Sequence, residues 1–154
     1  MAQYTGKVWV LGDDIDTDII IPTEYLALKT IEDMKQYGFS PLRPELAGQI
    51  QPGDIIVAGK NFGCGSSREQ APEVIKALGI PCIIAKSFAR IFYRNALNNG
   101  LLLLEQPELH DVVKEGDTIT VTVNEDVDYN GKKYPIASLP ENLMEIIEAG
   151  GLVK

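Results

Sequence analysis

A glycine-rich loop between an apolar run and an amphipathic pattern constrains the fold of this chain more than any other stretch. Residues 59–71 read Gly-Lys-Asn-Phe-Gly-Cys-Gly-Ser-Ser-Arg-Glu-Gln-Ala, and the apolar run of residues 54–58 precedes them. After the loop, apolar residues recur at helical spacing as far as Leu78. The pattern predicts a buried strand, a loop whose glycines permit positive φ, and a helix whose first N–H groups can bind an anion.

The loop matches none of the familiar glycine-rich motifs. A dinucleotide fingerprint would need a third glycine, a P-loop would need Gly-Lys-Ser/Thr, and a nucleophile elbow would need Gly-x-Ser-x-Gly. What remains is an anion site with the hydroxyls of Ser66 and Ser67 and the guanidinium of Arg68. An alternative is that the serines only cap the helix, because Glu69 and Gln70 give them capping-box spacing.

Length and charge favour one globular domain over residues 1–154. The chain is 45% hydrophobic and 23% charged, which is enough to build a single core. A formal net charge of −8 argues against nucleic acid or an anionic membrane as a partner. The sequence has no apolar run of the roughly 20 residues that span a membrane and no basic and then apolar leader, so we expect a cytoplasmic protein.

Metal ligands are scarce in the sequence. Two cysteines, Cys64 and Cys82, and one histidine, His110, are too few for a cluster or a zinc site. Cys82 lies in an apolar run and is interpreted as core packing. Cys64 is either a small residue beneath the loop or a thiol activated at a helix N-terminus. Any metal that this chain uses must therefore arrive on another chain.

The middle of the chain predicts a β-α-β-α-β run. Apolar strands are expected at residues 54–58, 82–85 and 101–104, with one helix after the glycine loop and a second from Ser87 to about residue 98. Such connections imply parallel strands with a ligand crevice at their C-terminal ends. The glycine loop lies at one of those ends.

The flanking segments complete an α/β fold. A first strand is expected at residues 7–11, an alternating strand at 118–123, a hairpin turn at 130–131 and a last helix from about 140 to 149. Together with the parallel run, these elements predict a three-layer β/β/α domain.

Two local patterns add expectations that a structure can test. Thr30 and Asp33 have capping-box spacing ahead of a short helix that Gly38 would end. Arg90 and Arg94 share one side of the second long helix. They could bind a partner or substrate, although surface salt bridges are the simpler interpretation.

Three motifs resemble those of a known family. Residues 12–18 (Gly-Asp-Asp-Ile-Asp-Thr-Asp), 63–69 (Gly-Cys-Gly-Ser-Ser-Arg-Glu) and 86–91 (Lys-Ser-Phe-Ala-Arg-Ile) are similar to the swivelling domain of the aconitase superfamily. The motifs occur in the family's order, and the resemblance covers nearly the whole chain. The length resembles the free-standing small subunit of two-chain 3-isopropylmalate dehydratases and homoaconitases. One departure is Gln70, where many relatives have histidine.

The resemblance implies a hydro-lyase that is active only with a large subunit. Ser66 would then be the base that removes a C–H proton, while Ser67 and Arg68 would hold a substrate carboxylate. Asp18 would point into the active site and pair with a histidine of the large subunit. A [4Fe-4S] cluster, held by the large subunit and not by this chain, would be the Lewis acid for the departing hydroxyl.

In that family, the loop that contains Ala27, Leu28 and Lys29 would read the variable part of the substrate. The two apolar residues fit an alkyl group such as that of 2-isopropylmalate, which belongs to leucine biosynthesis, and no arginine is present for a further carboxylate. Lys29 leaves open a homoaconitase or a related malate-derivative dehydratase. Two other interpretations remain, namely a hydrolase built on Cys64 and His110 and a non-catalytic carboxylate-binding module.

Overall fold

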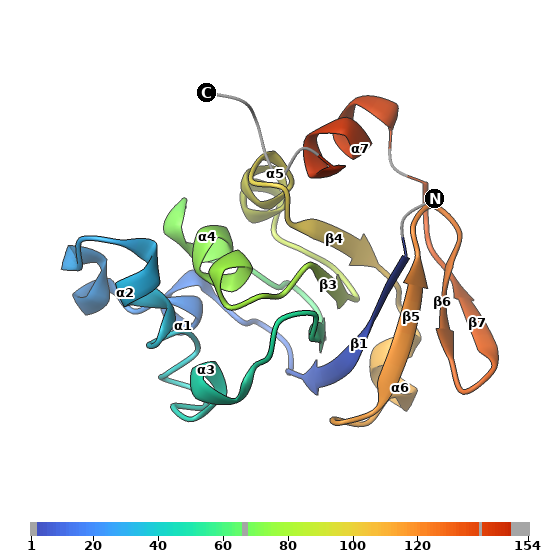
Figure 1. Ribbon diagram of the computed structural model, residues 1–154, viewed down its shortest axis with the longest axis horizontal. Coiled ribbons are helices and arrows are strands. Elements are labelled where there is room, and N and C mark those ends of the chain that lie inside the picture. The colour runs from blue at the N-terminus through green and yellow to red at the C-terminus, as the bar shows by residue number, and fades with distance from the viewer. Residues whose placement is uncertain (1–2, 66–67, 139, 149–154) are drawn as a thin grey trace.

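The computed structural model describes residues 3–65, 68–138 and 140–148. At its centre lies a seven-stranded sheet in the order β4-β3-β2-β1-β5-β6-β7 (Figure 1). The strands are β1 (Gln3–Val10), β2 (Ile55–Ala58), β3 (Cys82–Ala85), β4 (Leu102–Glu105), β5 (Thr118–Thr122), β6 (Asp126–Tyr129) and β7 (Lys132–Pro135). The helices are α1 (Thr17–Ile20), the 3-10 helix η1 (Thr23–Ala27), α2 (Ile31–Lys35), α3 (Leu46–Gln49), α4 (Gln70–Ala77), α5 (Arg90–Asn98), α6 (Leu109–Val112) and α7 (Glu141–Glu148).

Strands β1 to β4 are parallel, and this confirms the β-α-β-α-β prediction. Ile56 pairs with Ile83 across β2 and β3, and Ile83 pairs with Leu103 across β3 and β4. On its other side β1 runs antiparallel to β5, with Thr5 opposite Thr120. The carboxyl ends of four neighbouring strands therefore meet at one edge, where parallel sheets bind ligands.

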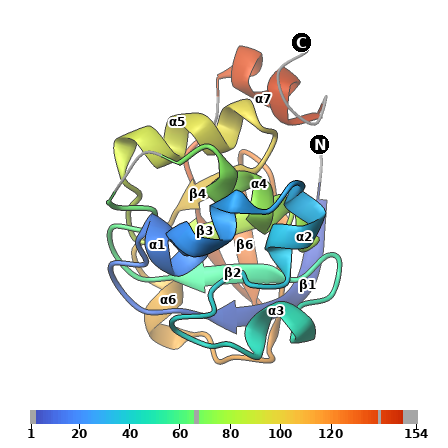
Figure 2. The ribbon, with the colours of Figure 1, turned by 90° about the vertical axis from the view of Figure 1, so that its left-hand side faces the viewer.

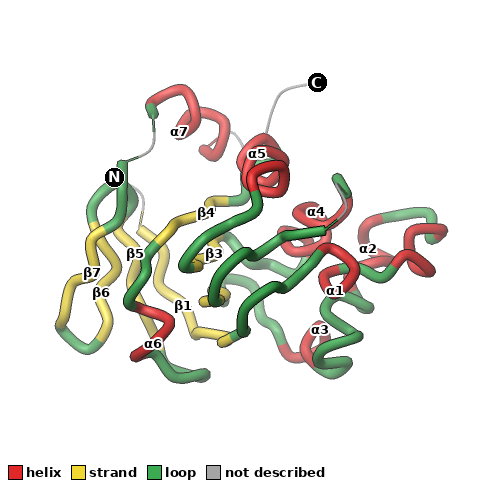
Figure 3. The backbone as a smooth tube through the Cα atoms, turned by 180° about the vertical axis from the view of Figure 1, so that it is seen from behind, coloured by secondary structure: helices red, strands yellow, loops and turns green. Residues whose placement is uncertain are grey.

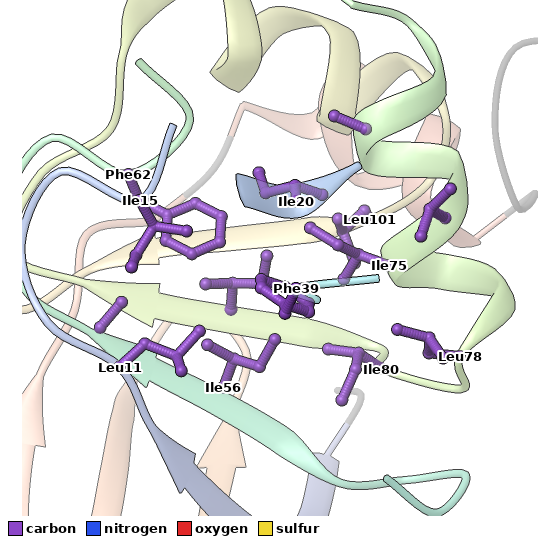
Figure 4. Packing of buried hydrophobic residues seen from close by; sticks show 14 of the residues in the cluster. Leu11, Ile15, Ile20, Phe39, Ile56, Phe62, Ile75, Leu78, Ile80 and Leu101 are labelled. Atoms are coloured by element: carbon purple, nitrogen blue, oxygen red, sulfur yellow. The ribbon is translucent and has the colours of Figure 1, made fainter. Parts of the chain in front are cut away.

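Alternate residues of the central strands face two separate cores. On β2, Ile56 and Ala58 face the first core, which α1, α2, α3 and α4 cover (Figures 2 and 4). Ile55 and Val57 face the second core, together with apolar residues of β5, β6, β7 and α6. The sheet therefore curls so that its antiparallel strands cover the second face of its parallel strands (Figure 3). This arrangement is the predicted three-layer α/β fold.

The two long helices of the parallel run begin later than the sequence predicts. The helix after the glycine loop starts at Gln70, with Glu69 in the N-cap position and no side chain capping it. Ser66 and Ser67, the two serines interpreted as alternative caps of this helix, lie outside the described residues. The second helix starts at Arg90 instead of Ser87, because Ser87 and Ala89 first form backbone hydrogen bonds with Phe62.

Other local predictions are confirmed. The side chain of Thr30 caps α2 by accepting a hydrogen bond from Asp33 N at 3.1 Å. Asn130 and Gly131 both have positive φ and join β6 to β7 as a hairpin. Within the described part of the chain, no helix combines the length and the apolar character that crossing a membrane would require.

Candidate functional site

The loops that leave β1 and β2 run side by side at the carboxyl edge of the sheet. Gly59 N donates to Gly12 O over 3.0 Å, and Asp14 N donates to Lys60 O over 2.8 Å. The side chain of Asp13 adds to this ladder, because its Oδ1 accepts a hydrogen bond from Lys60 N at 2.7 Å. Residues 12–18, here called the acidic motif, therefore hold the first half of the glycine loop.

The ladder continues along the second half of the glycine loop. Gly63 N donates to Ile15 O over 2.7 Å, and Thr17 N donates to Cys64 O over 2.9 Å. Each loop is also anchored by one buried apolar side chain, Ile15 in the first and Phe62 in the second, and these two lie together in the first core (Figure 4). Two motifs more than 40 residues apart in the sequence are thus joined by hydrogen bonds into one unit.

The third motif supports the glycine loop from its other side. Lys86 N donates to Gly59 O over 3.0 Å, and the hydroxyl of Ser87 accepts a hydrogen bond from Asn61 N at 2.8 Å. Phe62 and Phe88 form an isolated parallel bridge, and their rings meet edge to face with centroids 6.0 Å apart. All three motifs that carry the family resemblance therefore meet in one place.

Two glycines of the loop are required by its geometry. Gly63 has a φ of +85°, and a Cβ at this residue would lie 2.2 Å from the ring of Phe92. Gly65 has a φ of +92°. The prediction that glycines give this loop positive φ is confirmed.

The guanidinium of Arg68 reaches back to the segment that follows the acidic motif. Its Nη1 pairs with the carboxylate of Asp18 and donates to Ile21 O over 3.1 Å, while Nη2 donates to Thr23 Oγ1 over 2.8 Å. The side chain of Arg68 is 13% exposed and that of Asp18 is 62% exposed. A cation with little access to water therefore lies beside a carboxylate that faces outward.

The predicted site residues fall into three groups. Arg68 and Asp18 are brought together, whereas Ser66 and Ser67 lie outside the described residues. Ala27 ends η1 and is exposed, as is Lys29. The remaining residue of that loop, Leu28, is half-buried and packs against the first core.

The segment that contains Ala27 has more regular secondary structure than the sequence predicts. It contains the 3-10 helix η1, and Tyr25 of this helix stacks on Tyr37 with ring centroids 3.9 Å apart and an interplanar angle of 2°. This stack and the bond from Arg68 to Thr23 hold η1 between α2 and the glycine loop.

Neither cysteine resembles an activated thiol or a metal ligand. Burial and the nearby carboxylates of Asp16 and Asp14 raise the pKa of Cys64, and burial raises the pKa of Cys82. Across the described residues, no three His, Cys, Asp or Glu side chains are grouped so that they could hold a metal ion. The residues present therefore do not fit an iron-sulfur cluster within this chain.

Two supporting residues were missed by sequence reasoning. Ser87 was assigned to a helix, but its hydroxyl accepts a hydrogen bond from the glycine loop. Thr23 follows a proline in a segment without periodicity, so no sequence signal links it to Arg68. A third contact had a signal, because Asp16 stands three residues before Ile19 and caps its N–H at 2.8 Å, as N-cap residues do.

A hollow lies beside α5, at the carboxyl end of β4. Its volume is about 330 Å³, and its lining residues are Phe88, Arg90, Tyr93, Leu103, Leu104, Glu105 and Ala137. Within the described residues, neither Arg90 nor Arg94 forms a salt bridge. The interpretation of these two arginines as surface salt bridges therefore stays a prediction.

Comparisons with known proteins identify the class to which this fold and this site belong. The family model "Aconitase C-terminal domain" matches residues 23–109. A crystal structure of a 3-isopropylmalate dehydratase from Methanocaldococcus jannaschii superposes with a TM-score of 0.92 at 40% identity, covering 98% of this chain and 91% of that one. The chain belongs to the aconitase C-terminal domain family.

Relatives narrow this assignment to one branch of the family. The 3-isopropylmalate dehydratase small subunit of Lachnospira eligens is 79% identical over 152 residues, which is 99% of this chain and 93% of that protein. The protein with the same name in Heliobacterium modesticaldum is 49% identical over 155 residues, covering 99% of this chain and 93% of that protein. Within the family, the chain therefore groups with the small subunits of 3-isopropylmalate dehydratase.

Proposed function

We propose that this chain is the small subunit of a two-chain hydro-lyase that isomerises 2-isopropylmalate to 3-isopropylmalate by dehydration and rehydration, a cytoplasmic step of leucine biosynthesis. The names of its relatives support this reaction and imply a large-subunit partner. The structural observation that carries the proposal is the position of Arg68. Its shielded guanidinium lies where the acidic motif and the glycine loop meet, as a carboxylate-binding group should.

Ser66 is the proposed base for the C–H proton. A neutral serine is too weak an acid to ionise near pH 7 by itself, and a helix N-terminus contributes at most about 2 kcal/mol. Further stabilisation must come from neighbouring charge, and Arg68 stands only two residues further along the chain. In this role Ser66 would take the proton from one carbon of the substrate and return it to the other.

Arg68 and Ser67 are the proposed carboxylate-binding pair. An arginine that is 13% exposed is poorly hydrated, so a charge-assisted hydrogen bond to a substrate carboxylate is stronger there than at the surface. Asp18 is 62% exposed despite its contact with Arg68. That exposure is compatible with its proposed second contact, a histidine of the large subunit.

The proposed Lewis acid belongs to the large subunit. Loss of the substrate hydroxyl needs an electrophile, and a [4Fe-4S] cluster held by cysteines of the large subunit would supply it. The two cysteines of this chain do not suit that role, because burial raises the pKa of both and one is fully buried. This chain therefore contributes the base and the carboxylate site.

The segment at Ala27, Leu28 and Lys29 is proposed to select the substrate. Ala27 is exposed at the end of η1 and can contact an alkyl group, while Leu28 supports it from the first core. An extra carboxylate would lack an arginine partner there and would be rejected. An inward turn of the exposed Lys29 would instead favour a homocitrate-like substrate.

The geometry disfavours a hydrolase built on Cys64 and His110. Nε2 of His110 lies 2.7 Å from Leu11 O, so one ring nitrogen already has a partner. The raised pKa of Cys64 opposes formation of a thiolate. A non-catalytic carboxylate-binding module shares the Arg68 geometry, and only turnover distinguishes it from a dehydratase.

Turnover of 2-isopropylmalate by the assembled enzyme tests the proposal. The chain would be purified alone and together with its large subunit, and both samples would be assayed for product and for cluster absorption. We expect the isolated chain to be colourless and inactive, and the pair to show both signals. Activity in the isolated chain, or carboxylate binding without turnover in the pair, would contradict the proposal.

A further inference from the structure

Arg68 uses three of its five N–H donors in contacts with residues that the structure describes. Nη1 contacts the Asp18 carboxylate and Ile21 O, and Nη2 contacts Thr23 Oγ1. The hydroxyl of Thr23 also donates to Oδ1 of Asp18 over 3.3 Å. Thr23 and Asp18 are therefore neighbours that share the edge of the guanidinium formed by Nη1 and Nη2.

The other edge of the guanidinium, formed by Nε and Nη2, is free of contacts with the residues that the structure describes. Nε–H and the second Nη2–H have no acceptor among the residues that the structure describes. These two donors are parallel, and an arginine fork of this kind binds a carboxylate through both oxygens. The orientation of Arg68 thus leaves a two-donor face for one carboxylate.

We propose that Thr23 is a positioning residue for the reaction, because its hydroxyl fixes the guanidinium of Arg68 with this Nε and Nη2 edge free for the substrate carboxylate. The inference rests on the proposed function, in which Arg68 binds that carboxylate. A hydroxyl suits the task because it accepts a hydrogen bond from Nη2 while it donates one to Asp18.

Thr23 also limits the pairing of Asp18 with Arg68. Because Thr23 occupies Nη2, Asp18 contacts the guanidinium through Nη1. Without the hydroxyl, the carboxylate of Asp18 is free to bind both terminal nitrogens or to move onto the Nε edge. An internal carboxylate in either place competes with the substrate for Arg68.

The hydrogen bond between Thr23 and Arg68 should affect substrate binding more than it affects substrate selectivity or folding. Thr23 begins η1, four residues before Ala27, and the stack of Tyr25 on Tyr37 holds η1 without it. The substrate carboxylate that Arg68 binds is common to isopropylmalate and homocitrate. Loss of the Thr23 hydroxyl should therefore weaken the binding of both substrates equally.

Kinetics of the assembled enzyme provide the first test. Thr23→Val keeps the shape of the side chain and removes the hydroxyl, whereas Thr23→Ser keeps the hydroxyl. We expect Thr23→Val to raise KM about tenfold and to change kcat by less than about threefold, because one hydrogen bond to a charged group is lost. Thr23→Ser should stay within about threefold of wild type in both constants. An unchanged KM in Thr23→Val, or equal defects in the two variants, would overturn the inference.

Arginine side-chain NMR on the isolated chain provides a second test that needs no activity. Hydrogen bonds to Thr23 and Asp18 should slow rotation of the Arg68 guanidinium, so its Nη–H signals should be resolved in wild type. In Thr23→Val these signals should shift if Asp18 takes over both terminal nitrogens, or disappear if it does not. Arg43 is an internal control, since its Nη1 and Nη2 donate to Glu115 over 2.6 and 3.0 Å and should be unaffected.

The two tests separate this inference from the proposed function. If the wild-type pair fails to turn over 2-isopropylmalate, the proposed function is wrong, and the substrate part of the inference is lost with it. If turnover is normal but Thr23→Val leaves the Arg68 Nη–H signals unshifted and keeps the wild-type KM, only the role of Thr23 is wrong.

Discussion

The side-chain amide of Asn61 donates to Oδ1 of Asp14 over 3.1 Å, and both residues have left-handed backbone conformations, with φ of 61° and 54°. The two residues lie in the paired loops that follow β1 and β2. Asparagine and aspartate tolerate this conformation better than other side chains that have a Cβ, because they hydrogen-bond locally. The pair therefore stabilises the hydrogen-bonded ladder between the two loops at the point where both loops turn.

Substitution of Asn61 should separate the hydrogen bond from the backbone effect. Asn61→Gly loses only the bond, whereas Asn61→Ala also incurs the left-handed penalty of about 1 to 2 kcal/mol. Urea unfolding should therefore rank the free energy of unfolding as wild type, then Asn61→Gly, then Asn61→Ala. Equal stability of the two variants would contradict the role assigned to φ.

Gly63 should be less tolerant of alanine than another glycine with the same backbone conformation. Gly63 and Gly116 have φ of +85° and +93°, so alanine at either residue is strained by about 1 to 2 kcal/mol. Only at Gly63 would the new Cβ overlap a ring, that of Phe92, whereas nothing lies within 4 Å at Gly116. Thermal unfolding should show a larger loss for Gly63→Ala, and an equal loss would argue against the close approach.

Removal of the proposed base should affect turnover more than binding. In the assembled enzyme, Ser66→Ala should lower kcat at least about a hundredfold, the low end for loss of a general base, with a modest change in KM. Steady-state kinetics with 2-isopropylmalate measure this effect. If Ser66→Ala were near normal and Ser67→Ala lost turnover, the roles of the two hydroxyls would be reversed.

The side chain at Ala27 should set the preference between substrates. An alkyl group of matching size gains roughly 1 to 3 kcal/mol in an apolar site, while an unpaired extra carboxylate is strongly rejected. We expect wild type to prefer isopropylmalate to homocitrate in kcat/KM, and Ala27→Arg to shift the ratio toward homocitrate. A wild-type preference for homocitrate would point to Lys29 as a carboxylate partner.

The ion pair between Glu115 and Arg43 should make stability depend on pH. The hydrogen bond from Arg43 lowers the pKa of Glu115 below its ordinary value of 4.5. The pair therefore contributes stability above about pH 4.5, and this contribution is lost as pH falls through the lowered pKa. Urea unfolding of Glu115→Gln and wild type should show a difference in stability that shrinks below that pH. Because Glu115 is 38% exposed, the effect should be modest, and a difference independent of pH would exclude it.

Most of the fold could be predicted from local sequence. The buried strands at Ile55–Ala58 and Cys82–Ala85 are short apolar runs between turn signals, and the hairpin at Asn130 and Gly131 is a two-residue pattern. Each pattern depends on neighbours within a few residues, so it can be recognised from the sequence alone. The same holds for the order of the three motifs, which carries the family resemblance.

Only the tertiary structure decided how those motifs act together. The start of α5 at Arg90 depends on hydrogen bonds between Ser87, Ala89 and the distant Phe62, which override the local helical pattern. The contact of Arg68 with Thr23 spans 45 residues and depends on how the sheet brings two loops to one edge. The sequence by itself determined the elements and the chemistry of the glycine loop. The fold decided which residues the glycine loop contacts, because contacts between distant loops have no periodicity along the chain.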